Sequence, residues 1–375
     1  MKSAGMNNHA AVEVIDLSHY WQVIRRQLKK IILFTLIIIS TCTGLLYIIL
    51  TQSESAGIFV LEKVAQQRFQ NQQKVENMLQ ITVCGSASPL GNNPDRAQAC
   101  IAVLTKDHFF IFDAGAGSQG RASQAGLPLA RLDGIFLTHL HSDHISDLPE
   151  FNMSAWVASG RSKPLTVWGP AGVETVTSGF NQAYRIDRGF RVLHHGSDFI
   201  PPEGGRLHPE TVRPGIVWQD DDLTITAFEV NHAPIEPAMG YRIDYLDRSV
   251  VISGDTVTSE NLFKAAAGAD ILFHDALARA VLNTMIDAAA AAGQQRAKKI
   301  ITDVIDYHAD ATKLQQLADD AGIRMLLFYH LVPSLDNPII EAFFARSLSG
   351  DSRIAEDLMV VELPINSDTI KIRSP

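Results

Sequence analysis

Residues 138–144 read Thr-His-Leu-His-Ser-Asp-His and directly follow four apolar residues, Gly-Ile-Phe-Leu at 134–137. Side chains alternate in an extended segment, so His139, His141 and Asp143 would share one side, while the chain bends to bring His144 round. Neutral imidazole and carboxylate are ligands that Zn²⁺ accepts, and the cluster holds no thiolate. The stretch predicts a metal site; the alternative is a polar loop that happens to be rich in histidine.

The composition indicates one large catalytic domain. The chain has 375 residues, of which 46% are hydrophobic and 19% charged. A domain of about 300 residues with an appendage fits this length better than two equal domains. The formal net charge is -9 and the main body holds no long Lys/Arg block, so nucleic acid is not an expected partner.

The appendage is an uncharged apolar run at residues 31–50, preceded by Arg25, Arg26, Lys29 and Lys30. At 1.5 Å per residue a helix of this length spans about 30 Å, which matches a bilayer core. The positive-inside rule then predicts a cytoplasmic tail at 1–30, a single-pass anchor in the bacterial inner membrane at 31–50, and a catalytic part facing the periplasm. The alternative is a cleaved signal peptide and a secreted enzyme.

The segment after the anchor divides into a stalk and the main domain. Residues 51–80 are rich in Gln and Asn, with apolar residues near helical spacing, and predict a stalk or linker. The hydrolase domain is predicted over 81–375. Near its start, Cys84 and Cys100 lie in two apolar runs and could form a cross-strand disulfide in an oxidising compartment. The alternative is a pair of buried free thiols.

Apolar runs typical of strands occur in both halves of this domain, for example at 223–230 and 325–329. Runs with helical patterns follow them, including one expected at 276–305. This order favours two sheets covered on the outside by helices.

Three further metal-ligating residues come at the ends of predicted strands. His232 follows the run 223–230, Asp255 follows 250–254, and His330 follows 325–329. Loops at strand ends can converge on one site, so we expect these three to complete the ligand set begun at 139–144. Taken singly, each could also be a cap or a surface residue.

The motifs together resemble the metallo-β-lactamase superfamily over roughly residues 81–363. They are the 138–144 stretch, Asp113-Ala-Gly, Ser253-Gly-Asp-Thr256 and the late His330. Further runs are similar to the branch that holds ribonuclease Z and the zinc arylsulfatases: Gly85-Ser-Ala-Ser-Pro89, Arg96, Phe273-His-Asp-Ala276 and Tyr307-His308. The resemblance implies an α/β fold, namely an αββα four-layer sandwich with the metals at one edge of the sheets; the N-terminal transmembrane helix would be added to it.

The resemblance also implies a role for each ligand and two Zn²⁺ ions, with Mn²⁺ or Fe²⁺ as alternatives. One ion would be bound by His139, His141 and His232, the other by Asp143, His144 and His330, and both by Asp255. A water between the ions would become the attacking hydroxide.

A proton donor is implied by the same resemblance. His308 would protonate the leaving oxygen and Asp275 would orient it, although the family usually carries Glu, which is one methylene longer. Direct and water-mediated contact between the two both remain open. His274 and Thr256 would support the ligands or contact the substrate.

Residues 145–150 and the lack of a basic Gly/Pro-rich arm look more like the arylsulfatase-like members. The expected function is therefore binuclear zinc hydrolysis of a small sulfate or phosphate ester, with Asp143, His308 and Asp275 as catalytic residues and a homodimer left open. Alternatives are a ribonuclease Z-type phosphodiesterase acting on RNA, a lactone or β-lactam hydrolase, and a non-catalytic metal-binding membrane protein.

Overall fold

The computed structural model divides the chain into two units, Met1–Asn71 and Gln72–Pro375. It describes residues 25, 28–29, 32–36, 39–45, 47–48, 53–70, 75–91, 93–334 and 337–375. The first unit contains helix α2 (Glu54–Gln70), within the predicted stalk.

The expected membrane anchor and inner-membrane location require correction. Among the described residues, no helix combines the length and the apolar character that a bilayer crossing needs. Residues 31, 37–38, 46 and 49–50 of the predicted span lie outside the described residues.

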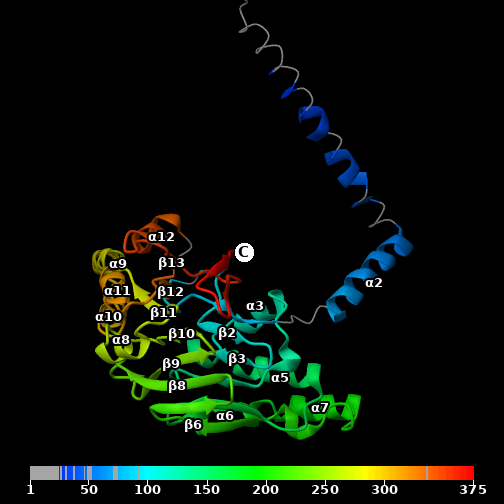
Figure 1. Cartoon of the computed structure of the whole chain (residues 1–375), viewed down its shortest axis with the longest axis horizontal. Coiled ribbons are helices and arrows are strands. Elements are labelled where there is room, and N and C mark those ends of the chain that lie inside the picture. Colours follow the sequence, from blue (N-terminus) through cyan, green and yellow to red (C-terminus); the bar gives the residue numbers. More distant parts are fainter. Residues whose placement is uncertain are drawn as a thin grey trace, which may run out of the picture. The chain divides into compact units, whose positions relative to one another are not determined.

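The second unit contains two mixed sheets (Figure 1). The eight-stranded sheet has the order β15 (Lys371–Arg373), β14 (Val360–Pro364), β1 (Met78–Gly85), β2 (Cys100–Leu104), β3 (Phe109–Phe112), β4 (Gly134–Phe136), β5 (Leu165–Gly169) and β6 (Leu207–Thr211). The seven-stranded sheet has the order β13 (Arg353–Ile354), β12 (Met325–Val332), β11 (Ile271–Leu277), β10 (Arg248–Ile252), β9 (Ala238–Tyr245), β8 (Leu223–Val230) and β7 (Gly215–Gln219).

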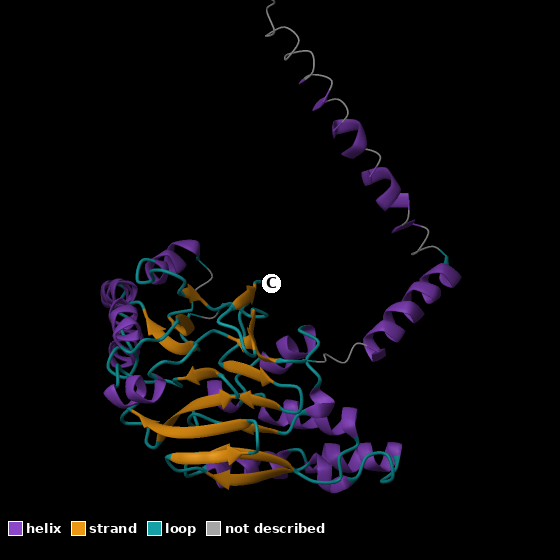
Figure 2. Cartoon of the chain, in the orientation of Figure 1, coloured by secondary structure: helices purple, strands orange, loops and turns teal. Residues whose placement is uncertain are grey.

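Helices cover both outer faces of the paired sheets (Figure 2). Those on the side of the eight-stranded sheet are α3 (Ser118–Gln124), α4 (Ser142–Ile145), α5 (Leu148–Ser159), α6 (Val173–Ala183) and α7 (Arg185–His195), with the 3₁₀ turns η1 (Leu129–Arg131) and η2 (Pro202–Gly205). Those on the other side are α8 (Glu260–Ala266), α9 (Arg279–Ala291), α10 (Gln295–Val304), α11 (Ala311–Asp320) and α12 (Pro338–Ala345). The predicted sandwich of two helix layers around two sheets is therefore confirmed.

The alternation of side chains along the strands explains the layers. In β2, Ile101 and Val103 belong to the core between the two sheets, whereas Ala102 and Leu104 belong to the core under the helices. Successive side chains of a strand point to opposite faces, so a strand that is apolar on both faces must be covered on both. All five residues of β2 are buried.

The long helix expected at 276–305 is divided in the structure. Strand β11 continues to Leu277, and two helices follow, α9 and α10. Between them Gly293 has φ +69°. A left-handed residue ends a helix, and glycine adopts this conformation without a Cβ clash, so the break is encoded by Gly293.

Cys84 and Cys100 form a disulfide that joins β1 to β2. Both residues are fully buried, and the bridge closes a loop with a sequence separation of 16. Of the two alternatives left open by the sequence, the bridge is the one formed.

Replacing both cysteines with serine should lower the free energy of unfolding by about 3 kcal/mol, because a loop of this length is no longer closed in the unfolded chain. Urea unfolding of the full chain checks this. The matched control is Cys42→Ser, which removes an exposed free cysteine and should unfold as the wild type does. An unchanged midpoint for the double variant would contradict the expectation.

Candidate metal centre

Seven predicted ligands come together at the edge of the sandwich where several strands end. His139 and His141 follow β4, His232 follows β8 and Asp255 follows β10. The short helix α4 begins at Ser142 and turns the chain, which places His144 beside Asp143 on the same site. The structure thus gathers side chains that lie up to 191 residues apart in sequence (139 to 330).

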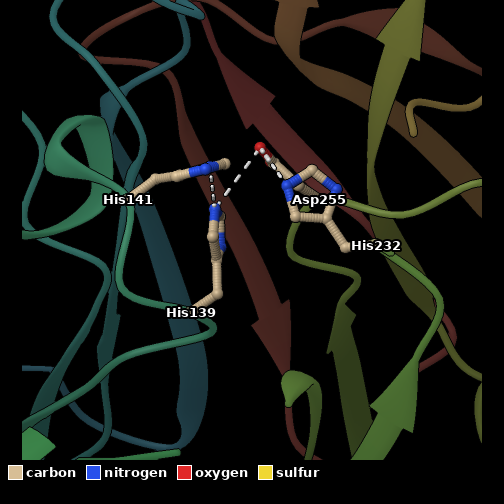
Figure 3. Close-up of side chains that lie close together, drawn as sticks. All are labelled: His139, His141, His232 and Asp255. Atoms are coloured by element: carbon tan, nitrogen blue, oxygen red, sulfur yellow. Dashed lines mark hydrogen bonds and ion pairs between the residues drawn. The ribbon is translucent and has the colours of Figure 1, made fainter. Parts of the chain in front are cut away.

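The first group consists of His139, His141, His232 and Asp255 (Figure 3). The His139 Nε2 and His141 Nδ1 atoms are 3.0 Å apart. The Asp255 Oδ2 atom lies 3.8 Å from His139 Nε2 and 3.9 Å from His232 Nε2. Four ligand atoms converging from three different loops form a set that could hold one metal ion.

The second group consists of Asp143, His144, Asp255 and His330. The Asp143 Oδ2 atom lies 3.0 Å from His330 Nε2 and 3.4 Å from His144 Nε2. Asp255 reaches His144 Nε2 through Oδ2 at 3.4 Å and His330 Nδ1 through Oδ1 at 3.4 Å. Asp255 therefore belongs to both groups, as a carboxylate shared by two cations would.

The hydrogen bonding of these side chains fits metal binding. Among the described residues, His144 Nε2, His232 Nε2 and Asp255 Oδ1 are buried without a hydrogen-bond partner. Buried polar atoms are costly to leave unpaired, and imidazole nitrogen and carboxylate oxygen are suitable ligands for divalent metals. The donor set thus matches a pair of divalent cations.

Electrostatics points the same way. Burial favours the neutral form of Asp255, yet charges on His330 and His144 hold the pKa of this carboxyl well below its ordinary value. Burial likewise opposes charge on His144, but Asp255, Asp113 and Asp143 raise its pKa well above the usual range. Without metal, protons on imidazoles balance the buried carboxylates; metal binding would displace those protons.

Asp113 orients His144 through its carboxylate. Its carboxylate lies 2.9 Å from His144 Nδ1 and accepts hydrogen bonds from the Thr138 backbone N–H at 2.8 Å and from Thr138 Oγ1 at 2.9 Å. This partner fixes the His144 ring so that Nε2 faces the site. The sequence motif contained Asp113 but assigned it no role; its signal was a strand-terminal Asp before a glycine turn.

His330 is placed by a bulge, which the sequence did not indicate. We expected it after the strand, but β12 continues to Val332. Asp275 pairs with Tyr329 and the next residue, Ala276, pairs with Leu331, so His330 is the extra residue of β12. Its φ of +45° lies in the left-handed region, and bulges of this kind re-aim a side chain beside an active site.

His232 and Asp255 are held by their neighbours. The His232 Nδ1 atom lies 2.9 Å from the Tyr307 carbonyl oxygen, which leaves Nε2 for the site. The Thr256 hydroxyl accepts from the Asn231 N–H and donates to the Asn231 carbonyl, both at 3.1 Å. Thr256 thereby ties the loop of Asp255 to the loop of His232.

Asp275 and His308 are in direct contact. His308 Nδ1 lies 2.9 Å from Asp275 Oδ2, which also accepts from the Ala309 N–H at 3.3 Å. The shorter Asp side chain therefore reaches the imidazole without a water. Burial raises the pKa of Asp275, but its hydrogen bonds with His274 and His308 lower it by more, so the group is anionic.

A pocket of about 220 Å³ opens onto this cluster. His308 lines it together with four residues of the two groups, His141, Asp143, Asp255 and His330. His274 is not among the lining residues; it is fully buried, and its Nδ1 lies 2.8 Å from the Asp275 carbonyl. Of the two supporting residues predicted, neither His274 nor Thr256 lines this pocket.

Comparisons with known proteins agree with this architecture. A family model described as Beta-lactamase superfamily domain matches residues 108–331, a range that includes all seven clustered side chains. The chain is 34% identical over 291 residues to ribonuclease Z of Mycobacterium bovis, covering 76% of this chain and 99% of that protein. It is also 34% identical to ribonuclease Z of Mycolicibacterium gilvum, covering 69% and 86%.

Solved structures share the fold. The metallo-β-lactamase fold protein YhfI from Bacillus subtilis superposes with a TM-score of 0.54 at 19% identity, covering 76% of this chain and 99% of that one. Human tRNase Z, short form, gives a TM-score of 0.51 at 19% identity, covering 76% and 100%.

These relatives correct two expectations. Curated relatives named ribonuclease Z contradict both the small-molecule ester as substrate and the exclusion of nucleic acid, and they give no support to an arylsulfatase-like activity. The exclusion rested on a net charge of -9. Net charge describes the whole surface, whereas bound cations dominate the local field at a metal site.

The family match and the paired ligand groups lead to the same conclusion. The chain belongs to the metallo-β-lactamase superfamily, in the branch that includes ribonuclease Z, and is a metal-dependent hydrolase acting on ester bonds.

Proposed function

We propose that this protein is a zinc-dependent phosphodiesterase of the ribonuclease Z type that cleaves RNA. The observation that carries the proposal is the direct Asp275–His308 pair beside the two ligand groups. A phosphodiester in RNA has a poor leaving group, an alkoxide, which needs a proton as the P–O bond breaks. A positioned imidazole can supply that proton. Relatives that carry the name ribonuclease Z support the choice of RNA.

Two Zn²⁺ ions are proposed at the two groups. His139, His141 and His232 would hold one and Asp143, His144 and His330 the other, with Asp255 shared. When bound, the ions supply Lewis acidity at the phosphoryl oxygens and lower the pKa of water to near neutrality.

The proton is proposed to come from His308. With Nδ1–H directed at the Asp275 carboxylate, the opposite ring nitrogen, Nε2, is the atom free to carry a proton to the leaving oxygen. The Asp275 carboxylate, 2.9 Å from Nδ1, holds the His308 ring in one orientation.

The decisive assay is cleavage of an RNA oligonucleotide by the purified, zinc-loaded full chain. We expect cleavage of RNA, and no turnover by Asp143→Ala, because that variant loses a ligand of one group. Hydrolysis of aryl sulfate without RNA cleavage, in protein that holds metal, would contradict the proposal.

Metal content tests the shared role of Asp255. Elemental analysis should give about two zinc ions per chain for the wild type, and Asp255→Ala should lower the content of both sites because both groups include this carboxylate. Asp319→Ala on α11, which removes an exposed carboxylate, is the matched control and should keep both ions. Loss of a single ion in Asp255→Ala would mean that the residue serves one site only.

The role of His308 is tested by changing the leaving group. His308→Ala should slow RNA cleavage by about 10²- to 10⁴-fold, the usual range for general acid catalysis. It should slow cleavage of bis-p-nitrophenyl phosphate much less, because nitrophenolate leaves without a proton. His194→Ala, on the exposed end of α7, should behave as the wild type on both substrates. Equal losses on the two substrates would exclude a proton-donor role.

A further inference from the structure

The pocket beside the metal groups has a second, apolar kind of lining. Besides the polar side chains already described and two serines, Ser88 and Ser142, it is lined by Pro89, Leu90, Val304, Tyr307 and Val332. A phosphate needs only the polar lining. The apolar and aromatic lining is therefore available to a different part of the substrate, one that is flat or apolar.

Tyr307 is a fixed element of this lining. Its side chain and that of Leu90 pack against a buried cluster that includes Val304 and Val332. The Tyr307 ring centroid lies 5.1 Å from that of His232 and 4.9 Å from that of His308. An aromatic ring held in this way loses little conformational entropy when a ligand stacks on it.

Tyr307 also lies next to the residues proposed to carry the reaction. Tyr307 directly precedes His308 in the loop between α10 and α11, and its carbonyl contacts His232. The ring is partly exposed, whereas the neighbouring His232 and His308 are buried. A group stacked on Tyr307 would thus lie beside the phosphorus that is attacked.

The size of the pocket limits what that group is. The pocket has a volume of about 220 Å³, so the group that stacks on Tyr307 is a small one. Proteins recognise RNA sequence mostly in unpaired bases, which stack on aromatic side chains.

We propose that Tyr307 and Leu90 form a platform that receives one unpaired nucleobase next to the scissile phosphate. This inference rests on the proposed RNA phosphodiesterase activity and makes Tyr307 a substrate-contacting residue. It predicts that the enzyme favours cleavage at a single-stranded position over cleavage within a duplex.

The test uses the zinc-loaded full chain and an RNA oligonucleotide whose cleavage position has been mapped. Base–aromatic stacking is worth about 1–3 kcal/mol, so Tyr307→Ala should lower kcat/KM by about 5- to 150-fold. Tyr307→Phe keeps the ring and should restore most of the loss. With an abasic nucleotide placed on one side of the cleaved bond, and then on the other, one of the two substrates should erase the difference between wild type and Tyr307→Ala.

The wild type alone provides a second measurement that does not depend on a stable variant. It should cleave one abasic substrate more slowly than intact RNA by the same factor. Equal cleavage of intact and both abasic substrates would overturn the platform, and so would a Phe variant no better than Ala, which would point to the hydroxyl. Failure of the metal-loaded wild type to cleave any RNA would overturn the proposed function and this inference together.

Discussion

The carboxylate of Asp255 is the point on which this site depends. Asp255 is 2% exposed. Its carboxylate lies within 3.9 Å of nitrogen atoms from four histidines, two from each group: His139, His232, His144 and His330. A buried carboxylate is stable only with positive charge nearby, and four imidazoles cannot all be protonated at such distances. Divalent cations at the two groups would resolve the conflict, because they would neutralise Asp255 and bind neutral imidazole. The geometry of the two sheets serves to bring these groups to one edge.

The surrounding fold holds the ligands by contacts behind them. Asp113 and the carbonyl of Tyr307 each fix one imidazole, and Thr256 ties two ligand loops together. His330 has a left-handed backbone that the flanking strand pairs impose. Hydrogen bonds that a ligand side chain makes with residues other than the metal fix its orientation and its basicity. The left-handed backbone of His330 is strained, and it is retained because the surrounding strand pairs fix its conformation.

Asp275 contacts His308 directly, although the family usually carries a glutamate at this position. An aspartate is one methylene shorter than glutamate, yet Oδ2 lies 2.9 Å from Nδ1. The β11 and β12 strands shift register between Asp275 and Ala276, and the Ala309 N–H binds the same oxygen. The loop that carries His308 and Ala309 thus lies within reach of an aspartate carboxylate at this position.

The sequence by itself determined the class of fold and the identity of the clustered residues. His139, His141, Asp143 and His144 are local in the chain, and apolar periodicity identified the strands that precede His232 and Asp255. What it misjudged was the class of partner, since the net charge of -9 describes the whole surface and does not report the field at a buried site. Only the tertiary structure decided the bulge at His330, the direct reach of Asp275 and the place of Tyr307 in the pocket. Those depend on register between strands and on loop packing, which are set by contacts between residues far apart in the chain.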